Sequence, residues 1–143
     1  MLDALQEFHK TGFVHLDVKP DNFRIGKDHV VKLLDFGLVI EYIRKEKHKP
    51  YERHGFSGTP YFASTKAHEG RVLSRRDDLE SLGYSMMALL NEEIPWENKE
   101  ISEFYKEKQD YLRKDYNDLK GIWRFVKLAS ELRFTEEPDY ERL

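Results

Sequence analysis

The chain contains no cysteine, which excludes disulfide bonds and zinc sites built from thiolates. It also has no apolar run close to the ~18 residues that a membrane-spanning helix needs, and its first residues do not form a signal peptide. Neither sign of charge is in large excess. The 24 Lys and Arg stand against 27 Asp and Glu, and the resulting net charge of −3 argues against a dedicated nucleic-acid binder. We therefore expect no membrane or nucleic-acid partner, and residence inside the cell, in the cytoplasm, the nucleus or both.

Aromatic residues make up 13% of the 143 residues, which argues against disorder because disordered segments contain few bulky side chains. The length suits one domain, or part of one, with a modest core. Helical periodicity is found in residues 1–10, 79–90, 101–112 and 122–132. Short strand-like runs are found at 13–15, 23–25 and 30–34, with a turn at 26–28. The predicted fold class is therefore α+β and mostly α-helical.

One long stretch, residues 38–75, shows no sustained period. Irregular stretches of this length are uncommon in compact domains and are often functional. The helix predicted after it, over 79–90, has a plausible N-terminal cap at Ser74 or Asp77. In the next helix the positions that recur on one face are Ile101, Phe104, Tyr105, Lys108, Tyr111 and Leu112.

Two motifs stand at a spacing that indicates phosphoryl-transfer chemistry. Residues His15–Asn22 read His-Leu-Asp-Val-Lys-Pro-Asp-Asn, and Asp35-Phe36-Gly37 begins thirteen residues after Asn22. Asp and Asn are common in turns, so either motif alone means little. Together, with a predicted strand hairpin between them and Asp35 at the end of a strand, they form a specific signal.

The residue types in these motifs suit the requirements of the reaction. Phosphoryl transfer needs cations on the phosphates and an oriented hydroxyl more than covalent help from the protein. Mg²⁺ prefers oxygen ligands, which the Asp35 carboxylate and the Asn22 amide provide. Asp17 is expected to face the incoming hydroxyl and accept its proton, while Lys19 neutralises the phosphoryl group. The expected metal ion is thus Mg²⁺. The expected metal ligands are Asn22 and Asp35, the set expected to hold the phosphate-bearing cofactor is Lys19, Asn22 and Asp35, and the catalytic set is Asp17, Lys19 and Asn22.

The two motifs resemble those in the C-terminal lobe of a eukaryotic protein kinase. His15–Asn22 is similar to the catalytic loop and Asp35–Gly37 to the metal-binding motif. Lys19 is the residue that serine/threonine kinases carry at its position. The resemblance implies ATP-dependent phosphorylation of Ser/Thr hydroxyls on protein substrates.

Further segments resemble the casein kinase 1 family. Ala63-Ser64-Thr65-Lys66 stands where that family has Ala-Ser-Ile-Asn and most kinases have Ala-Pro-Glu. The other similar segments are 58–64, 74–84, 94–96 and 132–140, and segments 67–70 and 95–97 also resemble the related vaccinia-related kinases. We interpret residues 1–143 as a partial kinase domain. Its catalytic loop and metal-binding motif lie at 13–37, and its activation and substrate-docking segment at 38–65.

The resemblance implies supporting roles for five further residues. His15, Phe36 and Gly37 are expected to be structural residues of the two motifs, with His15 packing and hydrogen-bonding rather than acting as a base. Thr59 would connect the substrate-docking segment to the catalytic carboxylate and lysine. Asp78 would cap the helix predicted over 79–90 and hydrogen-bond the backbone of the catalytic loop, although a carboxylate at a helix N-terminus is also favourable by itself, by ~0.3–1 kcal/mol.

Two residues depart from the kinase pattern. Leu16 stands where most of these kinases have an arginine that pairs with a phosphorylated residue of the activation segment. Leucine cannot make this contact, so we predict that no phosphate within 38–58 switches the protein through it. Tyr61 replaces a family arginine that binds the phosphate of an already phosphorylated substrate, and a phenol brings no positive charge at neutral pH. A preference for such substrates is therefore not expected from this position.

The sequence contains neither the glycine-rich loop nor the Val-Ala-Ile-Lys strand of a kinase N-terminal lobe. We therefore expect the N-terminal lobe to be absent. We also expect apolar surface to be exposed where it would sit, so the rest of the lobe or another chain is a possible partner. An alternative is a non-catalytic kinase-like binding or scaffold module. A small-molecule kinase is disfavoured by the segments typical of protein-substrate kinases at 58–64 and 74–84.

Overall fold

The computed structural model describes residues 1–44, 47–48, 55–115, 117, 119 and 121–143. Its helices are α1 (Leu2–Lys10), the short 3-10 helix η1 (Pro20–Asn22), α2 (Thr65–His68), α3 (Arg75–Leu89), α4 (Ile101–Leu112) and α5 (Ile122–Glu131). Its strands are β1 (Phe13–Val14), β2 (Phe23–Ile25), β3 (Val31–Leu33), β4 (Ile40–Glu41), β5 (Ile43–Arg44) and β6 (Lys47–His48). The strands pair in antiparallel ladders, β1 with β4, β2 with β3 and β5 with β6.

The mostly helical character predicted from periodicity is confirmed, and the predicted helices lie within a few residues of α1, α3, α4 and α5. Of the two caps predicted for α3, Ser74 is confirmed, since the helix begins at Arg75, four residues before the first periodic residue. The Asp77 carboxylate accepts a hydrogen bond of 2.8 Å from the Ser74 backbone N–H and so stabilises this start. The stretch 38–75 is less irregular than predicted, since it includes α2 and the strands β4, β5 and β6.

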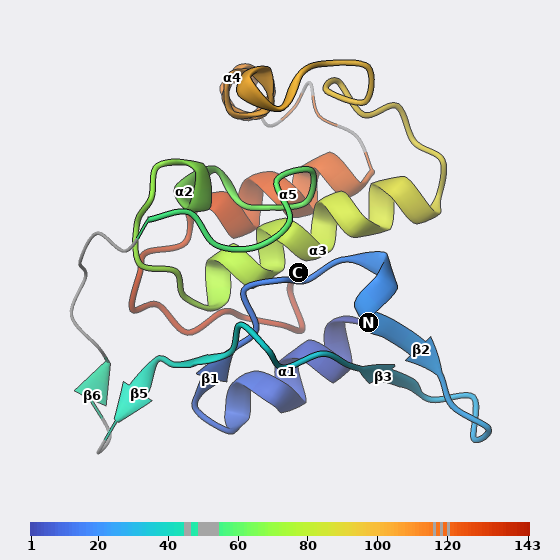
Figure 1. Cartoon of the computed structure of the whole chain (residues 1–143), viewed down its shortest axis with the longest axis vertical. Helices are drawn as coiled ribbons and strands as arrows, with labels where there is room; N and C mark the ends of the chain where they lie inside the picture. Colours follow the sequence, from blue (N-terminus) through green and yellow to red (C-terminus); the bar gives the residue numbers. More distant parts are fainter. Residues whose placement is uncertain (45–46, 49–54, 116, 118, 120) are drawn as a thin grey trace.

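Helix α3 lies in the middle of the molecule, with α2 and α5 beside it, α4 on one side and α1 on the other (Figure 1). Its apolar residues join the main core, together with the indoles of Trp96 and Trp123. The ring of Tyr84 packs edge-on against both indoles, with centroid distances of 4.9 and 6.2 Å. Among the described residues, no helix is long and apolar enough to cross a bilayer.

Gly83 allows α3 and α5 to approach closely. A Cβ atom at this position would lie 2.4 Å from a methyl carbon of Val126 and 3.1 Å from the Phe125 ring. We predict that Gly83→Ala lowers the free energy of unfolding by about 1–3 kcal/mol, because overpacking outweighs the better helix propensity of alanine. Denaturant unfolding measures the change, and Val126→Ala in the same background should recover part of it. A Gly83→Ala protein more stable than wild type would contradict this account.

Three buried carboxylates in the first turns of α3 hold two other segments, the start of α2 and the loop after β1. Asp77 accepts a hydrogen bond of 2.8 Å from the Ser64 hydroxyl at the start of α2. Glu80 accepts one of 2.7 Å from the backbone N–H of Thr65. Asp78 accepts hydrogen bonds from the segment that follows β1. Burying a carboxylate is costly unless it is fully hydrogen-bonded, so these contacts fix the loops around the start of α3.

Candidate active site

The centre of the site is the carboxylate of Asp17, in the loop between β1 and η1. Its Oδ1 accepts hydrogen bonds from the backbone N–H of Thr59 (2.9 Å) and from the Thr59 hydroxyl (2.7 Å). Its Oδ2 accepts one of 2.7 Å from Nζ of Lys19, which also donates to the Thr59 hydroxyl oxygen at 3.0 Å. Residues 42 positions apart in the sequence thus meet in one closed network, and Thr59 contacts both residues that the resemblance implied.

The charge state of Asp17 follows from these contacts. Partial burial alone would raise the pKa of the Asp17 carboxyl, but the hydrogen bonds from Lys19 and Thr59 lower it below its ordinary value. The group is therefore ionised at neutral pH and can act as an acceptor. It is only partly buried, which leaves it open to an incoming hydroxyl.

Asn22 and Asp35 are brought to the same region by the backbone. The Asn22 side chain donates 2.8 Å to the backbone oxygen of Asp17, so its amide oxygen is the atom left to face a cation. The backbone oxygen of Asn22 accepts a 2.8 Å hydrogen bond from the N–H of Leu34, the residue before Asp35. Asp35 is exposed and has a positive φ of 59°, and one of its oxygens accepts from the Gly37 N–H. One amide and one carboxylate oxygen suit Mg²⁺.

No group of three or more His, Asp or Glu side chains that could hold a metal ion is found among the described residues. The pair formed by Asn22 and Asp35 is a smaller set. It fits an ion such as Mg²⁺, which keeps several waters and phosphate oxygens as its remaining ligands.

His15 connects the two motifs and is fully buried. Its Nε2 lies 2.9 Å from the backbone oxygen of Leu34, and its Nδ1 accepts a hydrogen bond of 3.3 Å from the N–H of Asp17. A single tautomer, with the proton on Nε2, makes both bonds. The His15 ring also packs edge-on against Phe36, whose ring stacks on Phe8 at 5.4 Å. His15 therefore has the packing and hydrogen-bonding environment that was predicted for it.

The Asp78 carboxylate, on α3, binds the backbone of the loop that carries His15 and Asp17. Its Oδ2 accepts a hydrogen bond of 2.6 Å from the N–H of His15, and its Oδ1 accepts one of 2.8 Å from the N–H of Leu16. A third hydrogen bond of 2.9 Å joins Oδ2 to Nε2 of His9, on α1. The carboxylate thus connects α1, α3 and the backbone that immediately precedes Asp17.

The comparisons with known proteins agree with this arrangement. A family model described as "Protein kinase domain" matches residues 1–132. The chain belongs to the protein kinase domain family. It is 32% identical over 155 aligned positions to "Probable serine/threonine-protein kinase FPV226" of Fowlpox virus (strain NVSL), covering 100% of this chain and 53% of that relative. To "Probable serine/threonine-protein kinase FPV212" of the same virus it is 34% identical, covering 100% of this chain and 51% of the relative. The chain therefore spans about half the length of these curated relatives.

Gly58 is the residue of this kinase domain that lets Thr59 reach Asp17. Its φ is +96°, and a Cβ atom there would lie 2.5 Å from the backbone oxygen of Leu16. Gly55, with φ +81° and no atom within 4 Å of an added Cβ, is a matched control for the backbone strain alone. We predict that Gly55→Ala costs about 1–2 kcal/mol of unfolding free energy and Gly58→Ala clearly more, because only the latter adds a clash with backbone. Chemical denaturation of both variants measures the difference, and equal losses would show that the clash is relieved at no cost.

The two departures from the kinase pattern have structural counterparts. Leu16 has a positive φ of 67°, and its side chain is buried in a second apolar cluster with Tyr42 and Ala63. Tyr61 packs against Trp96 and Phe104 at centroid distances of 6.2 and 5.8 Å. The side chains of Leu16 and Tyr61 thus both pack against apolar or aromatic neighbours. The prediction about phosphates within 38–58 stays a prediction, and residues 45–46 and 49–54 of that segment lie outside the described part.

Sequence reasoning missed two residues of the kinase domain. His9 lies outside both motifs, yet it is buried between Asp78 and the hydroxyl of Tyr140, which lies 2.6 Å from its Nδ1. Its position four residues after Leu5 on the apolar face of α1 was an available signal. Lys108 was predicted only to lie on one face of a helix, although a lysine among apolar positions indicates a buried contact.

Proposed function

We propose that this chain is the C-terminal lobe of a casein kinase 1-like protein kinase, and that it takes part in the transfer of phosphate from ATP to Ser/Thr hydroxyls of protein substrates. The observation that carries the proposal is the closed network of Asp17, Lys19 and Thr59. The two fowlpox virus relatives, both named as probable serine/threonine-protein kinases, support it. Such a reaction takes place inside the cell, so cytoplasmic or nuclear residence belongs to the same proposal.

Asp17 has one remaining place for the substrate hydroxyl. An ionised carboxylate offers about four acceptor sites. Three of them are used by the hydrogen bonds from Thr59 and Lys19, all of 2.9 Å or shorter, and the fourth is met by a long contact of 3.5 Å from the Asn22 side-chain N–H, which a substrate hydroxyl can displace. The lowered pKa makes Asp17 a weak base, which suits a reaction that needs an oriented hydroxyl more than early proton removal. Asp17 therefore orients the hydroxyl and takes its proton as the phosphoryl group is transferred.

Lys19, Asn22 and Asp35 would hold the nucleotide and its metal ion. A bound Mg²⁺ supplies positive charge on the triphosphate. Asn22 presents its amide oxygen from η1, and Asp35 presents a carboxylate oxygen from the turn after β3. Nζ of Lys19 carries positive charge beside Asp17, where it balances the charge of the phosphoryl group during transfer.

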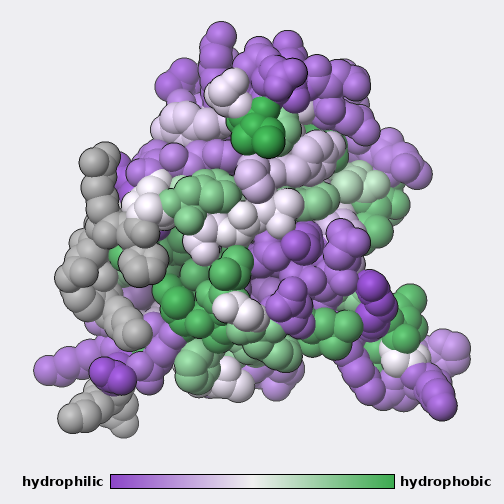
Figure 2. All heavy atoms as spheres, viewed as in Figure 1, coloured by the Kyte–Doolittle hydropathy of each residue, from purple (hydrophilic) through white to green (hydrophobic). Residues whose placement is uncertain are grey.

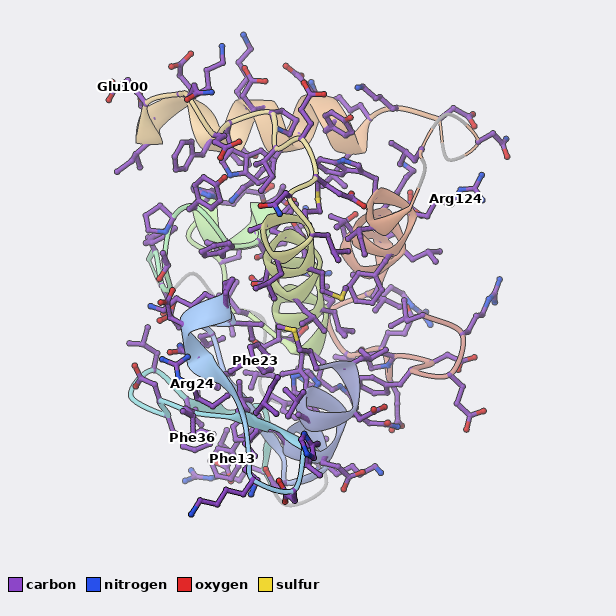
Figure 3. All side chains as sticks on the ribbon, turned by 90° about the vertical axis from the view of Figure 1, so that its right-hand side faces the viewer. Phe13, Phe23, Arg24, Phe36, Glu100 and Arg124 are labelled. Carbon is purple, nitrogen blue, oxygen red and sulfur yellow. The ribbon has the colours of Figure 1, made fainter. Side chains whose placement is uncertain are left out.

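An apolar surface lies beside this site. Large apolar side chains are exposed at the end of β2, on either side of β3 and in the segment that follows, including Ile25 (73% exposed) and Phe36 (54% exposed). Figure 3 shows Phe36 at the end of the molecule opposite Glu100, and Figure 2 shows hydrophobic residues gathered over the lower half of the view, whereas α4 is covered mostly by hydrophilic ones. In this proposal the other lobe of the kinase domain covers this surface and closes the nucleotide cleft.

The same surface is the observation that favours the second candidate, a non-catalytic scaffold. In that case the apolar side chains bind a partner protein and the chain transfers no phosphate. The intact set of Asp17, Lys19, Asn22 and Asp35 favours the first candidate, because a scaffold has no need of this charged set.

A phosphorylation assay separates the two candidates. The full-length protein is incubated with Mg-ATP and unphosphorylated Ser- and Thr-containing proteins, and phosphoserine and phosphothreonine are detected by mass spectrometry. We expect transfer that stops when Mg²⁺ is chelated with EDTA. The 143-residue chain alone is assayed in parallel, and its binding of Mg-ATP is measured by calorimetry. If the full-length protein neither transfers phosphate nor binds Mg-ATP, the kinase proposal is wrong and the scaffold is favoured.

A further inference from the structure

Lys108 is fully buried although it lies on α4, a helix whose other lysine, Lys106, is exposed. Buried lysines are rare because the ammonium group loses its hydration, so each one needs partners. Nζ of Lys108 donates hydrogen bonds to the backbone oxygens of Pro60 (2.9 Å) and Ala63 (2.7 Å). It also lies 4.8 Å from the ring centroids of Tyr84 and Trp96, where cation–π attraction is favourable.

These contacts hold the turn that carries Thr59. Within the turn, the backbone oxygen of Thr59 accepts hydrogen bonds from the N–H groups of Phe62 (3.0 Å) and Ala63 (2.9 Å). From outside, Nε1 of Trp96 donates 3.0 Å to the backbone oxygen of Tyr61, while Lys108 binds the oxygens on either side of it. One face of the turn is thus fixed by α4 and its preceding segment, and the other face is presented to Asp17.

A cation suits this place because two carbonyl oxygens converge on one point. An ammonium group has three donors and can satisfy both oxygens at once, whereas an apolar side chain offers a donor to neither. Nε2 of His68 also lies 3.2 Å from the Pro60 oxygen and 3.3 Å from Nζ of Lys108. Burial lowers the pKa of Lys108, and the buried carboxylate of Glu80 opposes this change. Glu80 is itself held by the Thr65 N–H and by the hydroxyl of Tyr84 at 2.9 Å, so the balancing charge is fixed in position.

We infer that Lys108 is a positioning residue, which acts through the Pro60–Ala63 turn to hold Thr59 against Asp17 and so orients the hydroxyl-binding carboxylate. The inference rests on the proposed function for its effect on phosphoryl transfer, but the contact itself can be tested without activity. Nothing in the two sequence motifs points to it, because Lys108 lies 91 residues after Asp17.

The test compares Lys108→Met, which keeps the length of the side chain, with Lys106→Met, which changes an exposed lysine on the same helix. Both are made in the full-length protein, and hydrogen exchange of the Thr59 amide is followed by NMR. We expect exchange at Thr59 to become at least about tenfold faster in Lys108→Met and to stay unchanged in Lys106→Met. A folded Lys108→Met protein with unchanged exchange at Thr59 would falsify the inference.

A double-mutant cycle on the rate of phosphoryl transfer provides the second readout. Lys108→Met should lower kcat by about 10–100-fold with little change in KM for ATP, because it misplaces Asp17 without touching the nucleotide. Adding Thr59→Ala should then cost little more, since both changes break the same contact. Additive losses would assign Lys108 a general structural role and overturn the inference. If wild type transfers no phosphate, the proposed function fails, while the exchange measurement still decides the contact.

The exchange and kinetic readouts need a folded variant. If Lys108→Met does not fold, Lys108→Gln takes its place, because an amide keeps two N–H donors but has a shorter reach. The same increase in Thr59 exchange is then expected, and its absence overturns the inference in the same way.

Discussion

Replacing Asp17 by Asn in the full-length protein is expected to slow phosphoryl transfer to protein hydroxyls by about 10²–10⁴-fold. The amide has nearly the same shape, and its oxygen can still accept the two hydrogen bonds from Thr59. Its NH₂ group, however, faces Nζ of Lys19, which donates 2.7 Å to the present Oδ2. The variant therefore loses the proton acceptor and sets two donors against each other, while the predicted metal ligands Asn22 and Asp35 remain.

This prediction separates catalysis from nucleotide binding. Initial rates at saturating Mg-ATP should fall by the stated factor, whereas the Kd for Mg-ATP measured by calorimetry should change little. Asp21→Asn is a suitable control, because Asp21 lies on η1 in the same loop but is exposed. Its rate should match that of wild type. A rate for Asp17→Asn within about tenfold of wild type would mean that another group accepts the proton.

The local patterns were the part of this molecule that sequence could predict. Hydrophobic periodicity located α4 within its observed bounds, because one apolar stripe on a helix has a period that is visible in a single segment. The pairing of β1 with β4 was not predicted, since two-residue strands carry no alternation and their partners lie far apart in the sequence. Helix α2 was missed for the same reason, because four residues are too few to show a helical period.

The residues of the candidate site likewise fall into two groups, those that the sequence could identify and those that it could not. The spacing of Asp17, Asn22 and Asp35 indicated phosphoryl-transfer chemistry because the three residues lie in two short motifs. The residues that hold those motifs in place come from distant helices, such as His9 and Lys108. Their polar atoms are paired by tertiary contacts that no local pattern encodes. A polar residue at an apolar position of a predicted helix is the signal that could have found both.

Asp78→Asn is expected to lower the free energy of unfolding by about 2–4 kcal/mol, although the substitution changes hardly any volume. In wild type the carboxylate accepts hydrogen bonds from three donors, the backbone N–H groups of His15 and Leu16 and the ring of His9. The imidazole of His9 can change tautomer and accept from the new NH₂ group. The two backbone donors have no such freedom. They approach different oxygens, so one of them faces the NH₂ group whichever way the amide is turned.

Denaturant unfolding measures this loss, and Asp110→Asn on α4 is its control. The Asp110 carboxylate is about half exposed and pairs with Arg113 at 3.3 Å, so its removal should cost at most about 0.5 kcal/mol. A loss confined to Asp78→Asn shows that burial of unpaired backbone donors is the cause. Since those donors belong to the residues just before Asp17, the same variant should also lose phosphoryl transfer at temperatures where it remains folded. An Asp78→Asn protein as stable as wild type would mean that the loop before Asp17 keeps its position by packing alone.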